Sequence, residues 1–525
     1  FGFEANDPTS PAAGALLRYL LDTQPGGAEP LAHLRPPRRI RTGATMTLDA
    51  ATIRSLELDK TAHSGDTKGS LRSVFKGCKT PMGRRTLRSW LVAPLLDIEE
   101  IHTRQRAVAA LVEDRSCADA IAEGCALIQD VARIGGRIAV GRATPRDLVA
   151  LADSINAAHP LQETLRDRPA LATVHAAIAR VLTSIAPLGE SIATRITDMP
   201  PAHIREGGVM RDGIDAVLDE ARGLSRDAHS WLAEYQAELI EATGISSLKV
   251  GFNKVFGYYI EISKAKALDE AIPPTFVRKQ TLKNAERYIT PDLKTFEDNV
   301  LGAEARAIER EKTLFAEQCA EAAKSLDALA EFADAIAVLD CLACFAETAH
   351  RLDWVQPTVD QSRDLRIRDG RHPVLDEMMR DGFVPNDTTL CADGAGTLAL
   401  ITGPNMAGKS TYIRQTALIV LLAQAGSFVP AAEAKIGRAD RIFTRVGAND
   451  ELHAGRSTFM VEMTEMANIL NNSTPQSLVI LDEIGRGTST LDGLSLAWAI
   501  VETLLAKTTR TLFATHYHEL TSIAE

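Results

Sequence analysis

The stretch Leu400–Arg414, LITGPNMAGKSTYIR, decides the fold of the C-terminal part of this chain. It contains the pattern G-x-x-x-x-G-K-[ST] from Gly403 to Ser410, preceded by an apolar strand and followed by a helical sequence. In such a loop the glycines let backbone N–H groups close around phosphate oxygens, and the helix N-terminus favours an anion. Lys409 would reach the outer phosphates, and the hydroxyl of Ser410 would bind Mg²⁺. The pattern therefore predicts a nucleotide site.

Acidic strand ends downstream supply what a phosphate site also needs. LVILDE, residues 478–483, ends in Asp482 and Glu483. We expect Asp482 to hold the metal shell and Glu483 to orient or deprotonate the attacking water. TLFATH ends another strand with His516, where a polar side chain could sense the terminal phosphate. The alternative, a metal pair made by His516 and His518, lacks a third candidate ligand nearby.

The bulk composition limits the class of protein. A chain of 525 residues should divide into several domains, and 45% hydrophobic with 24% charged residues is ordinary for a soluble globular protein. We find no run approaching the roughly 18 apolar residues of a membrane span. The seven cysteines suit a reducing cytosol, and Cys341 and Cys344, a C-x-x-C pair within a helical stretch, favour core packing over zinc. A cytoplasmic protein is predicted.

Before the nucleotide loop the periodicity is mainly helical. Residues 46–200 repeat apolar positions at helical spacing, which predicts an all-α core. Two long helical stretches follow, Asp215–Thr243 and Ala303–Val355, the second without Gly or Pro. Between them, residues 244–299 include the strand signal YYIEIS, Tyr258–Ser263. From about residue 357, strands and helices alternate, as in a mainly parallel α/β sheet.

The module between the long helices is locally basic. From Lys249 to Lys294 there are nine basic and five acidic residues, an excess of +4 in a chain whose net charge is -11. On charge alone, a solvated surface and a surface that binds the phosphate backbone of DNA are equally good interpretations, and the position between two long helices favours the second. The candidate DNA-binding residues are Lys254, Lys264, Lys266, Arg278, Lys279, Lys283 and Arg287.

Several blocks of sequence together resemble a known family. Residues 401–431, 450–470, 478–502 and 512–520, among them GRSTFMVEM and FATHYHEL, resemble the ATPase domain of the MutS family of DNA mismatch-repair proteins. GFNKVFGYYIEIS (251–263) is similar to its clamp domain, and TPMGRRTLRSWLVAPLLD (80–97) to its core. The resemblance implies the end of a connector domain and linker at 1–40, a helical core and first lever at 41–243, a clamp at 244–299, a second lever helix at 300–356, and an ATPase of the ATP-binding-cassette type at 357–525.

The resemblance also implies an activity and its residues. ATP would be hydrolysed to ADP and phosphate with Mg²⁺, and the nucleotide state would control a DNA-encircling clamp dimer. Phe383 in DGFVPN would stack on adenine, Ser457 would reach the phosphate bound by the other subunit, and His516 would be the switch histidine. The expected phosphate-binding residues are Gly403, Pro404, Asn405, Met406, Ala407, Gly408, Lys409, Ser410 and Thr411. Ala407 stands where the family often has Gly, at a free position of the pattern.

Two departures from the family pattern shape the expected behaviour. FGFE, Phe1–Glu4, aligns with the end of the connector domain rather than with the Phe and Glu that read a mismatch. From the resemblance we also expect the helices that follow HYHEL in the family to be missing. We therefore expect a fragment with weak ATPase activity and a weakened homodimer, which binds duplex DNA weakly and without mismatch specificity. A MutL-type repair protein is the implied partner, and the implied location is cytoplasmic, on the nucleoid when DNA is bound.

Three rival interpretations differ in what they require of the sequence. A structural protein of chromosomes would need coiled coils longer than 525 residues can supply, and a transporter ATPase subunit would not carry a basic module on lever helices. A paralogue that lacks the mismatch domain by nature and binds branched DNA stays open.

Overall fold

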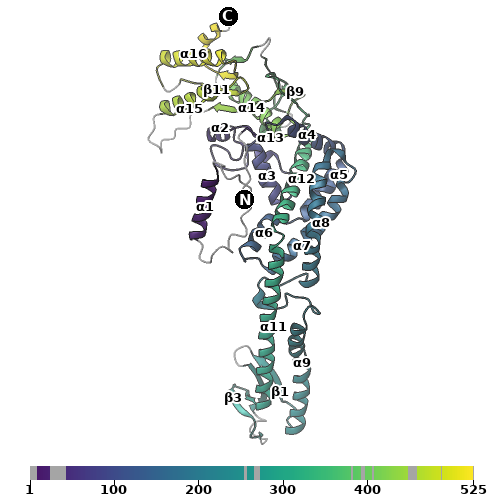
Figure 1. Ribbon diagram of the computed structural model, residues 1–525. Helices are drawn as coiled ribbons and strands as arrows, with labels where there is room; N and C mark the ends of the chain where they lie inside the picture. The colour runs from purple at the N-terminus through teal and green to yellow at the C-terminus, as the bar shows by residue number, and fades with distance from the viewer. Residues whose placement is uncertain are drawn as a thin grey trace.

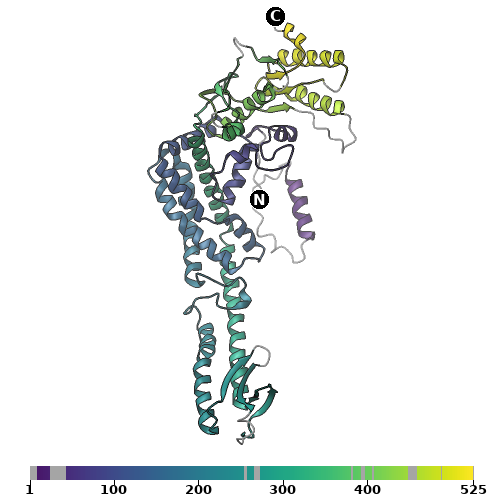
Figure 2. The ribbon, with the colours of Figure 1, turned by 180° about the vertical axis from the view of Figure 1, so that it is seen from behind.

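A computed structural model describes residues 9–23, 43–253, 257–264, 272–379, 382–391, 396–404, 407–446, 458–485 and 488–523. Figures 1 and 2 show an elongated molecule with three regions. The two sheets of the C-terminal part lie at one end, a bundle of helices lies in the middle, and a narrow arm with a small sheet at its tip forms the other end.

The middle region is helical, as predicted for residues 46–200. Most of its helices begin at an Asp or Thr whose side chain accepts a backbone N–H of the first turn, for example Thr80 and Asp97. α12 (Leu326–Leu352) runs through the centre of the bundle and buries most of its side chains against the helices around it. The other helices are α2 (Ala50–Ser55), α3 (Pro81–Val92), α4 (Ile98–Glu113), α5 (Arg115–Leu127), α6 (Val131–Ala139), α7 (Pro145–Leu165) and α8 (Ala172–Arg195), with short 3₁₀ turns η2 (Leu71–Val74), η3 (Pro169–Leu171) and η4 (Ile204–Glu206); α1 (Ser10–Thr23) precedes them.

One helical segment corrects an expectation from the sequence. Among the described residues, Pro169–Arg195 is long and apolar enough to cross a membrane by length and composition, although no such run was expected. Ile178, Leu182 and Ile185 of α8 are nevertheless fully buried in the same core cluster as the rest of the bundle. The segment packs as a core helix, against α7 and α12.

The arm consists of α9 (Ala216–Thr243) and α11 (Pro291–Ala323), which lie side by side in both views. Their far ends carry an antiparallel sheet of order β1-β2-β4-β3, and the predicted strand 258–263 falls within β2. Trp231 of α9 stacks on Phe296 of α11 with ring centroids 3.8 Å apart, which joins the two helices near the sheet. The strands are β1 (Lys249–Asn253), β2 (Gly257–Ser263), β3 (Val277–Thr281) and β4 (Ala285–Ile289).

The long helical stretch 303–355 is not one rod. The structure has two helices there, because the backbone leaves the helix at Lys324 and Ser325 between α11 and α12. α11 also starts at Pro291, inside the range assigned to the clamp. Thr290 caps it by accepting the N–H of Leu293, and Pro291 occupies the first turn, where its missing N–H costs nothing.

The C-terminal part contains the predicted parallel sheet. Its order is β10-β11-β12-β8, and a second sheet of order β5-β9-β6-β7 lies beside it. α14 (Lys409–Ala425) is buried from Gln415 to Ala425 because it packs against strands of both sheets. The remaining elements are β5 (Thr358–Asp360), β6 (Leu365–Gly370), α13 (Pro373–Met379), β7 (Asn386–Leu390), β8 (Leu398–Ile401), β9 (Glu433–Gly437), β10 (Ile442–Arg445), α15 (Thr458–Asn472), β11 (Leu478–Asp482), α16 (Thr490–Ala506), β12 (Arg510–Ala514) and η7 (His518–Ile523).

Candidate functional site

Strand register brings the predicted residues to one edge of the parallel sheet. Asp482 of β11 is paired with Ala514 of β12, and Ala514 is paired with Ile401 of β8. The segments that follow these three strands therefore start side by side. Ligand sites in open parallel sheets lie at this carboxyl edge.

The loop after β8 is shaped by glycine and by the buried lysine. Gly408 is the residue before α14 and has a φ of +89°, a backbone conformation that side chains disfavour. Lys409 opens α14, is only 9% exposed, and its Nζ donates a hydrogen bond of 2.6 Å to the carbonyl oxygen of Gly403. The hydrogen bond thus holds the ammonium group of Lys409 next to Gly403, where a phosphate would need a cation.

Ser410 and Asp482 form the candidate metal position. The side chain of Ser410 acts on the Asp482 carboxyl, across a separation of more than seventy residues in sequence. Burial raises the pKa of the Asp482 carboxyl, and the neighbouring charge of Glu483 raises it further, whereas the hydrogen bond from Ser410 opposes the shift. Oδ1 of Asp482 is buried and has no hydrogen-bond partner within the described part of the chain. A hydroxyl and a carboxylate with a free buried oxygen fit Mg²⁺, which prefers hard oxygen ligands.

Glu483 and His516 lie opposite each other at the ends of adjacent strands. Nε2 of His516 contacts Oε1 of Glu483. Glu483 has a φ of +53°, which is uncommon for a residue with a side chain, and its N–H donates to the carbonyl oxygen of Ala514 at 2.8 Å. Backbone strain held in place by a neighbouring strand is typical of residues that act in chemistry.

The structure does not cover every predicted site residue. Asn405, Met406 and Ser457 lie outside the described residues, as does the FGFE stretch. Phe383 lies between α13 and β7 and is half-buried, and its stacking on adenine stays a prediction. The described members of the predicted phosphate loop are Gly403, Pro404, Ala407, Gly408, Lys409, Ser410 and Thr411.

The candidate DNA-binding residues described at the arm tip are two arginines that lie beside acidic side chains and three exposed lysines. Arg287 is half-buried, forms an ion pair of 2.9 Å with Glu261, and lies 3.9 Å above the ring of Tyr259. Arg278, which is exposed, is 3.4 Å from Glu286. The three lysines Lys264, Lys279 and Lys283 are exposed, and Lys254 and Lys266 lie outside the described residues.

Two of these lysines lie close to the same turn. The backbone N–H of Lys264 donates to the carbonyl oxygen of Asn284 at 3.1 Å, so Lys264 lies next to the β3–β4 turn that carries Lys283. Lys279 lies on edge strand β3, at a register shift between Arg278 and Gln280.

Sequence reasoning missed two residues that contact the site. Glu462 of α15 and Tyr517 both hydrogen-bond the backbone of Gly485, two residues after Glu483. They belong to the quoted blocks GRSTFMVEM and FATHYHEL, but nothing in the pattern marked them apart from their neighbours. Cys341 and Cys344 are fully buried in α12, which confirms the prediction of core packing.

Fold and site together define a multidomain protein in which an α/β domain is joined to a helical body with a long arm. The α/β domain carries lysine, serine, carboxylate and histidine side chains at one sheet edge. The family model for MutS domain III matches residues 51–346, and that for MutS domain V matches residues 399–525. The chain belongs to the MutS family.

Similar proteins cover this chain almost completely. It is 48% identical to a protein of Rhodopirellula baltica named DNA mismatch repair protein MutS, over 100% of this chain and 58% of that protein. Proteins of the same name from Acetivibrio thermocellus and Salinibacter ruber are each 46% identical, over 98% and 100% of this chain and 58% of either protein. The chain therefore spans less than two thirds of the length of these relatives.

Proposed function

We propose that the C-terminal domain binds and hydrolyses ATP and is the ATPase domain of a DNA mismatch-repair protein. The observation that carries the proposal is the convergence at one sheet edge of Lys409, the Ser410–Asp482 pair and the Glu483–His516 pair. Each residue type suits one part of phosphoryl transfer: a cation for the outer phosphates, oxygen ligands for a metal, and a base for water.

The chemistry can be assigned to the residues of this chain. Lys409 exchanges the carbonyl of Gly403 for phosphate oxygens and neutralises their charge. Glu483 accepts a proton from the attacking water, whose oxygen bonds to the terminal phosphorus while the bond to the β-phosphate oxygen breaks, giving ADP and phosphate. His516, in contact with Glu483, orients that carboxylate. Bound Mg²⁺, held by Ser410 and Asp482, would withdraw charge from the phosphates.

The arm suits a role in holding DNA. Its tip sheet exposes Lys264, Lys279 and Lys283, on the end of the molecule opposite the ATPase domain. Lysines contact the phosphate backbone without reading bases, so this surface would bind duplex irrespective of sequence. The domain division proposed is a connector end at 1–40, core and first lever at 41–243, clamp at 244–299, second lever at 300–356 and ATPase at 357–525.

The assembly is also part of the proposal. Two ATPase domains would face each other in a homodimer, with Ser457 of one subunit completing the site of the other, as in ATP-binding-cassette proteins. The relatives are named DNA mismatch repair proteins, which supports DNA as the proposed partner. A MutL-type protein as second partner and a cytoplasmic location are proposed from the family resemblance.

The test compares nucleotide binding with turnover. Glu483→Ala should keep ATP affinity and lose hydrolysis, because it removes the base while sparing the loop that holds the phosphates. Glu519→Ala is the matched control, since it removes an exposed carboxylate three residues after His516. Wild-type turnover in Glu483→Ala would remove Glu483 from the water-activating role, and unchanged ATP affinity and turnover in Lys409→Ala would refute the site itself.

A further inference from the structure

The loop after β11 is held on both sides of one residue, Gly485. Its N–H donates a hydrogen bond of 2.7 Å to Oε1 of Glu462, which is only 6% exposed. Its carbonyl oxygen accepts a hydrogen bond of 3.3 Å from the hydroxyl of Tyr517, the residue after His516. Gly485 thus links α15, the Glu483 loop and the His516 loop.

This link requires two glycines in contact. Gly485 has a φ of +90°, a conformation that side chains disfavour. A Cβ on Gly493, in the first turn of α16, would lie 2.3 Å from the hydroxyl oxygen of Tyr517 and 2.5 Å from the carbonyl oxygen of Gly485. Only a glycine at position 493 leaves room for the hydrogen bond between Tyr517 and Gly485. The packing of α16 is therefore fitted to this contact.

The same contacts fix the backbone on which Glu483 is carried. The segment 483–485 is held at both ends by hydrogen bonds. At its start, the N–H of Glu483 donates to the carbonyl oxygen of Ala514 in β12. At its end, Gly485 is hydrogen-bonded to Glu462 and Tyr517. Glu483 itself has a positive φ, a conformation that persists only where its surroundings enforce it. Loss of the anchor at Gly485 would let this segment relax and swing the carboxylate away from His516.

We propose that Glu462 is a positioning residue for hydrolysis, and that it acts by accepting the N–H of Gly485 and so orienting the Glu483–His516 pair. Tyr517 is the second anchor of the same segment. The proposal rests on the proposed ATPase function. Through this hydrogen bond, the position of α15 would determine the orientation of Glu483, the residue proposed to activate water.

A buried carboxylate could instead serve stability alone, and the substitutions are chosen to separate the two roles. Glu462→Ala removes the acceptor, whereas Glu462→Gln keeps an amide oxygen that can accept the same N–H. Asp440→Ala is the matched control: Asp440 accepts hydrogen bonds of 2.8 Å from Thr474 and Ser477 at the opposite, amino edge of the same sheet. Steady-state ATPase kinetics of the 525-residue chain, with its thermal unfolding midpoint, supply the readouts.

The expected pattern is a split between kcat and KM. Glu462→Ala should lower kcat at least about tenfold with KM within about twofold, because a misplaced base affects the chemical step more than binding. Glu462→Gln should restore kcat to within about twofold of wild type, and Asp440→Ala should leave kcat unchanged. Wild-type kcat in Glu462→Ala, or a Gln variant as slow as the Ala variant, would overturn the positioning role.

Two further outcomes keep the test decisive. If Glu462→Ala unfolds, Tyr517→Phe removes the other anchor by deleting a single hydroxyl, and unchanged kcat in that variant would overturn the proposal. If wild type hydrolyses ATP and Glu483→Ala does not, a normal Glu462→Ala defeats only the positioning role. If Glu483→Ala is as active as wild type, the proposed function fails first.

Discussion

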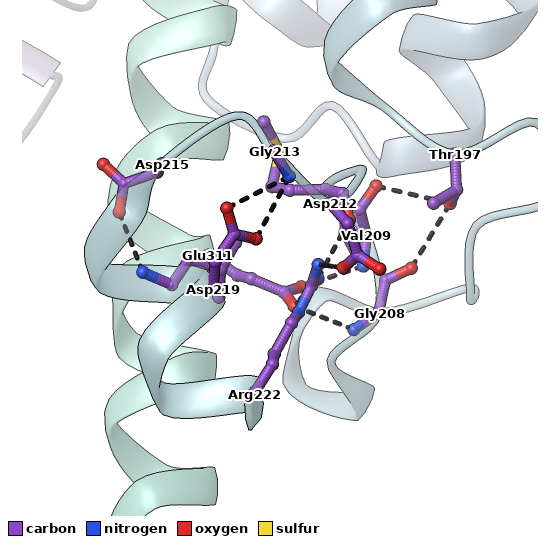
Figure 3. A network of polar contacts seen from close by, with 11 residues as sticks. Thr197, Gly208, Val209, Asp212, Gly213, Asp215, Asp219, Arg222 and Glu311 are labelled. Atoms are coloured by element: carbon purple, nitrogen blue, oxygen red, sulfur yellow. Dashed lines mark hydrogen bonds and ion pairs between the residues drawn. The ribbon is translucent and has the colours of Figure 1, made fainter. Parts of the chain in front are cut away.

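The backbone N–H of Val209 donates a hydrogen bond of 2.8 Å to Oε2 of Glu311, which joins the loop leaving the helical body to the middle of the longest arm helix. Figure 3 shows how this carboxylate is surrounded. Oε1 of Glu311 accepts the N–H of Gly208 at 3.0 Å and pairs with the guanidinium of Arg222 on α9. One buried side chain of α11 thus holds both the loop and the other arm helix at the point where the arm meets the body.

Glu311→Ala should therefore destabilise the junction strongly. The change leaves the buried N–H of Val209 and the N–H of Gly208 without their acceptor. It also removes one of the two carboxylates that pair with Arg222, which keeps Asp212, and the expected loss in the free energy of unfolding is about 3 kcal/mol. Glu309→Ala, two residues away on the same helix, removes a carboxylate that is 71% exposed and paired with Lys312, and should cost less than about 1 kcal/mol. Urea denaturation of both variants checks this, and equal midpoints for the two would contradict the role given to Glu311.

Lys409→Ala should weaken ATP binding or abolish hydrolysis while the fold stays intact. Its ammonium is held next to Gly403 at the proposed phosphate position, and Lys409→Ala leaves the phosphate charge uncompensated. Lys435→Ala, which removes a lysine of β9 that is 45% exposed and 3.5 Å from Asp360, is the control and should bind ATP normally. Equilibrium binding of a fluorescent ATP analogue, with circular dichroism to verify folding, decides the point.

His372 should make stability depend on pH. Burial, and then the charge of Arg414, lower its pKa to about 4, well below the ordinary value. Above the ordinary value of about 6.5 the histidine is neutral in both states; as pH falls below it, the unfolded chain takes up a proton that the folded chain refuses, so stability is lost down to about pH 4. Between pH 8 and pH 5 the expected loss in the free energy of unfolding from this histidine is about 2 kcal/mol.

His372→Gln should remove that part of the pH dependence. Urea midpoints of wild type and variant, taken from pH 8 to pH 5, should diverge as the pH falls, with wild type losing more stability. The control is His518→Gln, which replaces an exposed histidine and should follow the wild-type curve. Parallel curves for wild type and His372→Gln would show that His372 does not titrate as a buried neutral group.

Local patterns could predict that the candidate site residues lie at one sheet edge, because that arrangement follows from where the strands end. The loop Gly403–Ser410 and the acidic pair at 482–483 each follow an apolar strand, and parallel strands gather such ends on one edge. The contact of Glu462 with Gly485 had no such signal, since it depends on how α15 packs against β10 and α16. Sequence spacing carries no information on that packing.

In the arm, too, the sequence indicated some features and gave no signal for others. The break at Lys324 and Ser325 lies in a stretch without Gly or Pro, so composition gave no warning of it. Pro291 after Thr290, in contrast, was a readable helix start. Counting charges treated Arg287 like the lysines, although its ion pair with Glu261 and its stacking on Tyr259 give it a place within the sheet.

The last prediction concerns DNA, where the exposed lysines of the arm tip should hold duplex without reading it. Binding should be weak and fall steeply with salt, with a log-log slope of roughly -0.9 per phosphate neutralised. Reversing Lys279 and Lys283 to Glu should flatten that slope, because Lys279 is exposed on edge strand β3 and Lys283 on the β3–β4 turn. Arg287→Ala should instead chiefly loosen the sheet. Titrations at one salt concentration, on duplexes identical except for a G·T mismatch, should give equal affinities, since phosphate contacts carry no base identity. A tenfold preference for the mismatch, about 1.4 kcal/mol, would mean that this chain contains an element that reads bases.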